Sequence, residues 1–217
     1  MNKNNLIPKL LWITIFGIAM AYVEAAVVVY LRAIFRPEGF QFPMNTMTDF
    51  KIKVEVFREA ATLFMLLSVA FLAGKKSWEK FAYFTLAFAV WDIFYYVWLK
   101  VLLDWPASIF DRDILFLIPV PWIGPVIAPV SVSLLLIVLS IMIAHSINKG
   151  CDFKPTFIPK MLALAGIAVI LYSFICDTGA TLQRQIPKPY MYELLIIGDG
   201  LFAAAIWISC PRERVKS

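Results

Sequence analysis

Three carboxylates lie inside apolar runs that are long enough to cross a membrane: Glu24, Asp92 and Asp199. A charged group at the middle of a bilayer costs about 2.5–3.5 kcal/mol on insertion scales, so each of them needs a partner or a function. Measured from the charged residues that mark one end of each run, Glu24 and Asp92 lie about 12 Å inward and Asp199 about 9 Å inward, at about 1.5 Å per residue. We therefore expect the three acids at a similar depth.

Carboxylates gathered at one depth suit proton relay, cation binding or acid–base work on a substrate that arrives from outside. We expect the three acids to form the floor of an outward-facing pocket. Its walls and rim are expected from the following residues: Arg58, Glu59, Tyr96, Asp111 and Asp113. The alternative is structural, because each acid can instead accept a hydrogen bond from a Tyr, Trp or Ser of a neighbouring helix.

The composition indicates a polytopic membrane protein. Of 217 residues, 61% are hydrophobic and 16% are charged, against about 25% charged in soluble domains. Mean hydropathy is +0.79. We expect an all-α bundle that forms one transmembrane domain over residues 1–217, with helices at about residues 10–31, 54–73, 81–103, 125–144, 161–176 and 191–209.

The segment before the expected fourth helix differs from the rest of the chain. It holds a polar start at residues 111–113, a short apolar stretch, and prolines at positions 119, 121, 125 and 129. Proline disfavours regular helix around it, so residues 119–124 are expected to be extended or turning. We expect a short re-entrant or broken segment over residues 104–124, with a plain surface loop as the alternative.

Several classes of site and partner do not fit the sequence. With a single histidine, histidine-built metal or haem sites are nearly excluded, and the three cysteines show no C-x-x-C spacing. We therefore expect no metal and no cofactor. No basic run resembles a nucleic-acid patch, so the expected partners are the lipid bilayer and either further copies of the chain or subunits of a membrane complex.

Short stretches of the chain resemble a group of bacterial multi-pass membrane proteins. They are YVEAAVVVYLR at residues 22–32, PEGF at 37–40, the pair Trp91-Asp92, and PVPWIGP at 119–125. The resemblance implies a bacterial inner-membrane setting and no particular mechanism. Six spans put both termini on one side, and the shorter basic loops on that side indicate that the termini are cytoplasmic.

The sequence favours transport or the handling of ions or protons through the acidic pocket. A subunit or assembly factor of a larger membrane complex is a second hypothesis. A membrane-embedded enzyme acting on a lipid or lipid-linked substrate at the outer face is a third, although the sequence has no nucleophile motif and no metal-ligand cluster. Whether the protein is an enzyme is left open by the residues alone.

Overall fold

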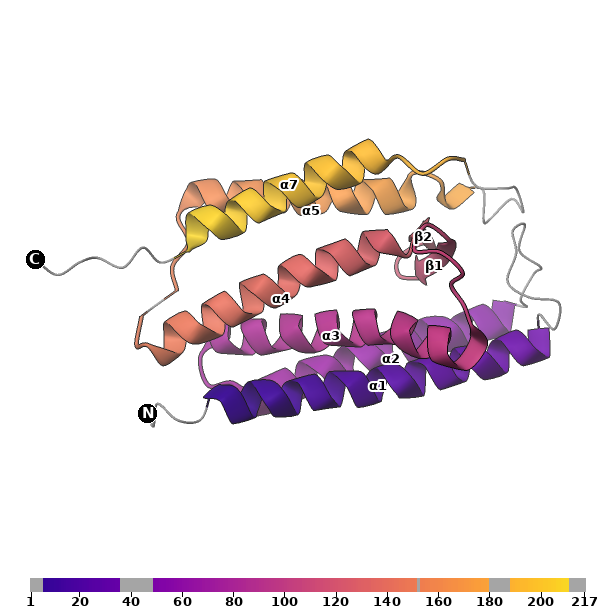
Figure 1. Ribbon diagram of the computed structural model, residues 1–217, viewed down its shortest axis with the longest axis horizontal. Helices are drawn as coiled ribbons and strands as arrows, with labels where there is room; N and C mark the ends of the chain where they lie inside the picture. Colours follow the sequence, from indigo (N-terminus) through magenta and orange to yellow (C-terminus); the bar gives the residue numbers. More distant parts are fainter. Residues whose placement is uncertain (1–5, 36–48, 152, 180–187, 211–217) are drawn as a thin grey trace, which may run out of the picture.

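Six helices make up most of the described structure (Figure 1). The structure is a computed structural model that describes residues 6–35, 49–151, 153–179 and 188–210. The helices are α1 (Leu6–Phe35), α2 (Asp49–Ala73), α3 (Ser77–Leu103), α4 (Ile127–Asn148), α5 (Phe157–Ile175) and α7 (Tyr192–Ser209). The segment 37–40, which carries part of the resemblance, lies outside the described residues.

All six helices are long and apolar enough to span a membrane, which confirms the prediction of a multi-pass helical protein. Their outward faces carry large apolar side chains in open exposure, such as Leu72 (88% exposed) and Trp207 (81%). A soluble protein rarely exposes so much apolar surface, whereas lipid covers it at no cost. The helix α2 begins at Asp49, earlier than the expected residue 54, because its charged first turns stay helical.

The helices form two groups that share α4. The first group packs α1 and α3 side by side, with α2 and α4 against α3, and the second pairs α5 with α7 on the other side of α4 (Figure 1). In the first group the buried core is built around Leu66, Tyr83 and Ile143. In the second group the core is smaller and is centred on Ile170 and Leu195.

Two short strands stand at one end of the bundle. The strands β1 (Arg112–Phe116) and β2 (Trp122–Pro125) pair antiparallel, with Ile114 opposite Ile123. We call this the hairpin end; α1 begins and α7 ends at the opposite end (Figure 1). Part of the segment expected to be broken or extended thus pairs as a hairpin, and the sequence did not predict this pairing.

The opposite end is held by a buried acid that the sequence analysis did not single out. Glu79, only 4% exposed, accepts hydrogen bonds from the Lys75 backbone N–H at 2.8 Å and from the Tyr83 hydroxyl at 3.0 Å. The Lys9 ammonium lies 3.4 Å from the same carboxylate and 3.1 Å from the Ala73 carbonyl oxygen. These contacts join α1 to the turn between α2 and α3.

Candidate functional site

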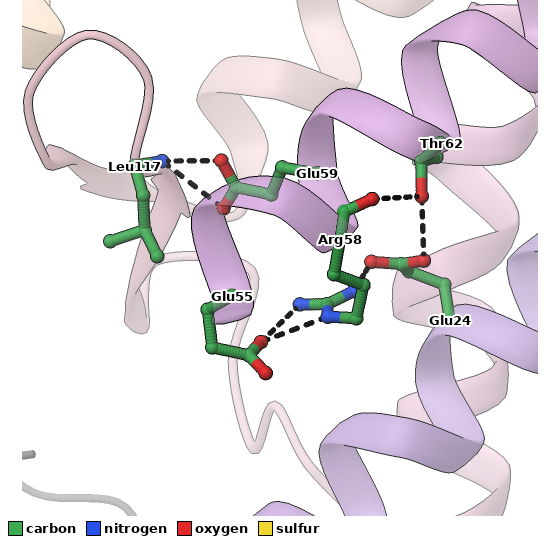
Figure 2. Close-up of polar contacts among 6 residues, drawn as sticks. All are labelled: Glu24, Glu55, Arg58, Glu59, Thr62 and Leu117. Carbon is green, nitrogen blue, oxygen red and sulfur yellow. Dashed lines mark hydrogen bonds and ion pairs between the residues drawn. The ribbon is translucent and has the colours of Figure 1, made fainter. Parts of the chain in front are cut away.

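Charged residues gather where α1 meets the first turns of α2, near the hairpin end (Figure 2). Glu55, Arg58, Glu59 and Thr62 come from α2, and Glu24 reaches across from α1. Residues three or four apart share a helix face, which is why the α2 side chains lie together. The structure therefore brings together three of the predicted residues, Glu24, Arg58 and Glu59.

Arg58 lies between two carboxylates. Its Nη1 pairs with Glu24 of α1, and its Nη2 and Nε lie 2.7 Å and 2.9 Å from the Glu55 carboxylate. The Thr62 hydroxyl lies 3.1 Å from both the Glu24 carboxylate and the Arg58 carbonyl oxygen. Glu24 is 6% exposed, so its charge is compensated where water cannot solvate it. These contacts make Glu24 a link between helices; the prediction had placed Arg58 at a pocket rim.

Glu59 holds the hairpin. Both of its carboxylate oxygens lie within hydrogen-bond distance of the Leu117 backbone N–H, at 2.9 Å and 3.1 Å (Figure 2). Leu117 directly follows β1, in the connection to β2. Charge-assisted hydrogen bonds of this kind are roughly twice as strong as neutral ones, so Glu59 fixes the hairpin against α2.

Asp92 contacts a hydroxyl group of the next helix. The Ser133 hydroxyl of α4 donates to Asp92 Oδ2 at 2.8 Å. Within the described residues Asp92 forms no ion pair, in contrast to Glu24. It lies inside the α3 span and is half-buried, at a depth where a charged carboxylate is costly. A carboxylate with a hydroxyl partner and no counter-charge can exchange a proton or a cation without breaking an ion pair.

Two tyrosines lie near both Asp92 and the charged groups at the hairpin. Tyr95 is within electrostatic range of Asp92, Arg58 and Asp113, and Tyr96 is within range of Asp92 and Asp113. Tyr96 is 6% exposed, and its ring lies 5.0 Å from that of Tyr95. The predicted residue Tyr96 therefore lies near Asp92, next to the half-buried ring of Tyr95.

Asp113 and Asp111, predicted at the pocket rim, make structural contacts. Asp113 is 3% exposed and lies 3.8 Å from Arg32 of α1, whose guanidinium stacks 4.0 Å above the Trp105 ring. Asp111 accepts hydrogen bonds from the backbone N–H groups of residues 107 and 108 at 2.8 Å and 3.0 Å. Asp111 thus closes the turn before β1, while Asp113 ties β1 to α1.

Asp199 lies on the other side of α4 from Asp92. It interacts with Ser131, and its Oδ1 is buried without a hydrogen-bond partner in the described part of the chain. Ser131 and Ser133 are two residues apart, so they project from α4 about 200° apart. The backbone therefore separates the two acids that these serines contact.

The single floor expected for Glu24, Asp92 and Asp199 is not what the contacts describe. Each acid has its own partner on a neighbouring helix. Glu24 contacts Arg58 of α2, Asp92 contacts Ser133 of α4, and Asp199 contacts Ser131 of α4. The cause is rotation of the helices, since residues at one depth still point in different directions around their axes. The position of a residue in an apolar run shows its depth in the membrane, but it does not show toward which neighbouring helix the side chain points.

The serines of α4 are the partners that the sequence analysis missed. Ser131, Ser133 and Ser140 interrupt a helix that is otherwise almost wholly apolar, and Ser140 lies 2.7 Å from the hydroxyl of Thr85 on α3. Small hydroxyl residues within a membrane span commonly mark hydrogen bonds between helices. The serines within the apolar run of α4 were therefore the feature of the sequence that could have indicated these contacts.

The described residues hold no group of three or more His, Cys, Asp or Glu side chains arranged to bind a metal ion. Asp104 lies just beyond the α3 span, 2.7 Å from Lys100 in the last turn of that helix, and the hydrogen bond and charge of Lys100 lower the pKa of this exposed carboxyl. Comparison of the chain with models of known protein families, with curated proteins and with solved structures found no match.

Proposed function

We propose that the protein moves protons or small cations across the membrane and that Asp92 is the carboxylate that binds them. The observation that carries this proposal is the contact between Asp92 and Ser133 across the α3–α4 interface, without a basic partner among the described residues. Ionisable side chains inside membrane spans commonly mark ion pathways and proton relays. Of the three acids in the expected floor, Glu24 is neutralised by Arg58, so it is less suited to exchange an ion.

The surroundings of Asp92 support this role. Tyr95 and Tyr96 are within electrostatic range of both Asp92 and Asp113, so they supply hydroxyl groups near Asp92 and near the hairpin. Asp199 supplies a second carboxylate on the far side of α4, against Ser131. Helix α4 with its serines is thus the element that both acids face.

The setting that fits this proposal is a bacterial inner membrane with both termini in the cytoplasm. The hairpin end then faces outward, and the re-entrant segment expected over residues 104–124 corresponds to a hairpin lying at the outer surface of the bundle. Arg32 stacks on Trp105 at this level, an arrangement typical of membrane interfaces.

Flux measurements test the proposal. Purified protein is reconstituted into vesicles that contain a pH-sensitive dye, and a potassium diffusion potential is imposed with valinomycin. Sodium and potassium gradients are tested in separate vesicles that contain no valinomycin and hold an indicator for the cation. We expect flux of protons or of one alkali cation above that of protein-free vesicles, and loss of most of that flux in Asp92→Asn.

The matched control is Asp104→Asn, which changes a carboxylate at the end of α3 whose side chain is 92% exposed. This variant should retain wild-type flux. If wild-type vesicles conduct protons, sodium and potassium no faster than protein-free vesicles, the transport proposal is wrong.

A further inference from the structure

A cavity of about 260 Å³ opens at the hairpin end, away from Asp92 and Glu24. It lies between the hairpin, the end of α5 and the residues that lead into α7. The lining residues that matter here are Arg112, Ser173, Cys176, Asp177, Lys188 and Tyr190. Drug-sized ligands occupy about 300–1,000 Å³, so this cavity suits a smaller group.

The cavity lies at the boundary of the spans. The α5 span ends at Ile175 and the α7 span begins at Tyr192, so residues on both sides of the cavity are the first ones beyond the apolar runs. Aromatic rings surround this level: Trp122 stacks 6.0 Å from Phe174, and Tyr190 lies 5.1 Å from Tyr192. Tyr and Trp concentrate where lipid headgroups meet the hydrocarbon, so the cavity opens at headgroup depth.

The charges of the cavity favour an anion with a cationic neighbour. Arg112 and Lys188 place two basic residues in the wall against one acid, Asp177. Asp177 accepts a hydrogen bond from the Lys188 backbone N–H at 2.5 Å, which fixes its position without using the Lys188 ammonium. Arg and Lys together are the residues that most often hold phosphate groups.

The hydroxyl groups of the wall add acceptors. The Ser173 hydroxyl donates to the Ile170 carbonyl oxygen at 2.7 Å, so Tyr190, 2.8 Å away, donates its proton to Ser173. Burial raises the pKa of Tyr190 to about 12, so its oxygen stays a neutral phenol. Its lone pairs, together with the Asp177 carboxylate, can accept hydrogen bonds from an ammonium group.

From this geometry we propose that the cavity binds a phosphate group that carries a nearby amine, as in an ethanolamine phosphate headgroup. Arg112 and Lys188 hold the phosphate, and Asp177 with Tyr190 accepts from the amine. The group comes either from a phospholipid of the surrounding leaflet or from a soluble phosphate ester, and both present the same chemistry. This site is separate from the proposed ion pathway and does not depend on it.

Cys176 lines the cavity and provides the readout. In a chain with Cys151→Ser and Cys210→Ser, it is the remaining thiol, because the sequence has three cysteines. Burial raises the pKa of Cys176, so modification by N-ethylmaleimide is followed at one fixed, mildly alkaline pH. The protein is purified in detergent and phosphate-free buffer, stripped of lipid, and its labelling rate is measured by mass spectrometry.

Four additions are compared: none, phosphatidylethanolamine in mixed micelles, diacylglycerol with the same acyl chains, and soluble O-phosphoethanolamine. We expect phosphatidylethanolamine to slow labelling several-fold and diacylglycerol to leave the rate unchanged. Protection by O-phosphoethanolamine alone identifies a soluble phosphate ester as the source, and protection by the phospholipid alone identifies a lipid headgroup. Equal rates with phosphatidylethanolamine and diacylglycerol, and no protection by O-phosphoethanolamine, overturn the proposal.

Variants separate a specific site from general shielding. Because the charge of Lys188 lowers the pKa of the Cys176 thiol, its removal changes the labelling rate by itself. Each variant is therefore judged by the ratio of its own labelling rates with and without the added ligand. Arg112→Gln with Lys188→Gln should abolish the protection, and Lys188→Gln alone, which keeps the backbone contact to Asp177, should weaken it. The control is Lys100→Gln, a basic residue at the end of α3 that does not line the cavity and should leave protection intact. Full protection in the Arg112 and Lys188 double variant contradicts the site.

Discussion

Arg58 neutralises one carboxylate of α1 and one of α2. One guanidinium contacts the carboxylates of Glu24 and Glu55, and Glu24 is almost fully buried. Removing one member of a buried ion pair costs more than the pair contributes, because the remaining charge stays without solvent or partner. These contacts give Arg58 and Glu24 a structural role, in contrast to the ion-binding role that we propose for Asp92.

This contrast predicts the behaviour of a double-mutant cycle. Arg58→Gln should lower the free energy of unfolding by about 3–5 kcal/mol, since it leaves two acids uncompensated. Adding Glu24→Gln should restore part of that loss, with a coupling energy of about 0.5–3 kcal/mol. Unfolding in mixed detergent micelles, followed by circular dichroism, measures both. Losses that simply add would show that the two side chains do not interact.

The sequence indicated which residues carry charge within the spans, but it did not indicate which of these residues contact one another. The apolar runs identified Glu24 and Asp92 as acids within spans, and Arg58 and Glu59 were expected in the same pocket. The partner of each acid depends on the rotation of a second helix, which a single sequence does not encode locally. Hence Arg58 was expected at a rim, and Ser133 was not singled out.

At the scale of elements, α5 and α7 pack closely through two glycines. A Cβ atom at Gly166 would lie 2.7 Å from the Gly198 carbonyl oxygen, and one at Gly198 would lie 3.0 Å from the Gly166 carbonyl oxygen. Small residues permit such close approach of helix backbones within membranes. Gly200, two residues further along α7, has nothing within 4 Å of its Cβ position.

Because Gly166 is closely packed and Gly200 is not, alanine should have different effects on stability at the two positions. Gly166→Ala forces the backbones of α5 and α7 apart and should lower the free energy of unfolding by about 1–3 kcal/mol. Gly200→Ala meets open space and should leave stability unchanged or raise it by up to about 1 kcal/mol through helix propensity. Thermal unfolding in detergent compares them. Equal stability of the two variants would contradict the close packing of α5 on α7.

The hairpin shows where element prediction from the sequence ends. Prolines at 119 and 121 correctly indicated that the chain leaves helical geometry, because proline lacks the N–H that a helix requires. The strand pairing of Ile114 with Ile123 joins residues across that break, and the carboxylate of Glu59 from another helix holds the connection. Neither contact is local, so the proline pattern alone did not predict them.

For the whole molecule, the number of spans was predicted because each apolar run is long enough to satisfy its own backbone in lipid. The division into a group of α1–α4 and a pair of α5 and α7 was not predicted, since it depends on which helix faces fit together.

The three cysteines lie at both ends of the bundle. Cys176 follows α5 at the hairpin end, whereas Cys151 and Cys210 follow α4 and α7 at the opposite end, and all three are exposed.

This placement predicts the sidedness of labelling by a membrane-impermeant maleimide. With cytoplasmic termini, single-cysteine variants in intact bacterial cells should label at Cys176, and Cys151 and Cys210 should label only after permeabilisation. Labelling of Cys176 should be slow at neutral pH and accelerate as the pH rises, because partial burial and the nearby Asp177 carboxylate raise the pKa of its thiol and so reduce the thiolate fraction. Labelling of Cys151 or Cys210 in intact cells would place the termini outside.

We propose that Asp92 exchanges an ion, whereas Glu24 holds α1 and α2 together. This difference between the two acids can be measured. It is tested most directly by measuring ion flux and unfolding side by side in Asp92→Asn and Glu24→Gln, two changes that each replace a carboxylate with an amide of the same shape. We expect Asp92→Asn to abolish flux and keep its stability, because the amide retains the hydrogen bond with Ser133. We expect Glu24→Gln to lose stability, because Arg58 loses a partner. Wild-type flux in Asp92→Asn, normalised to folded protein in the vesicles, would show that Asp92 does not bind the ion.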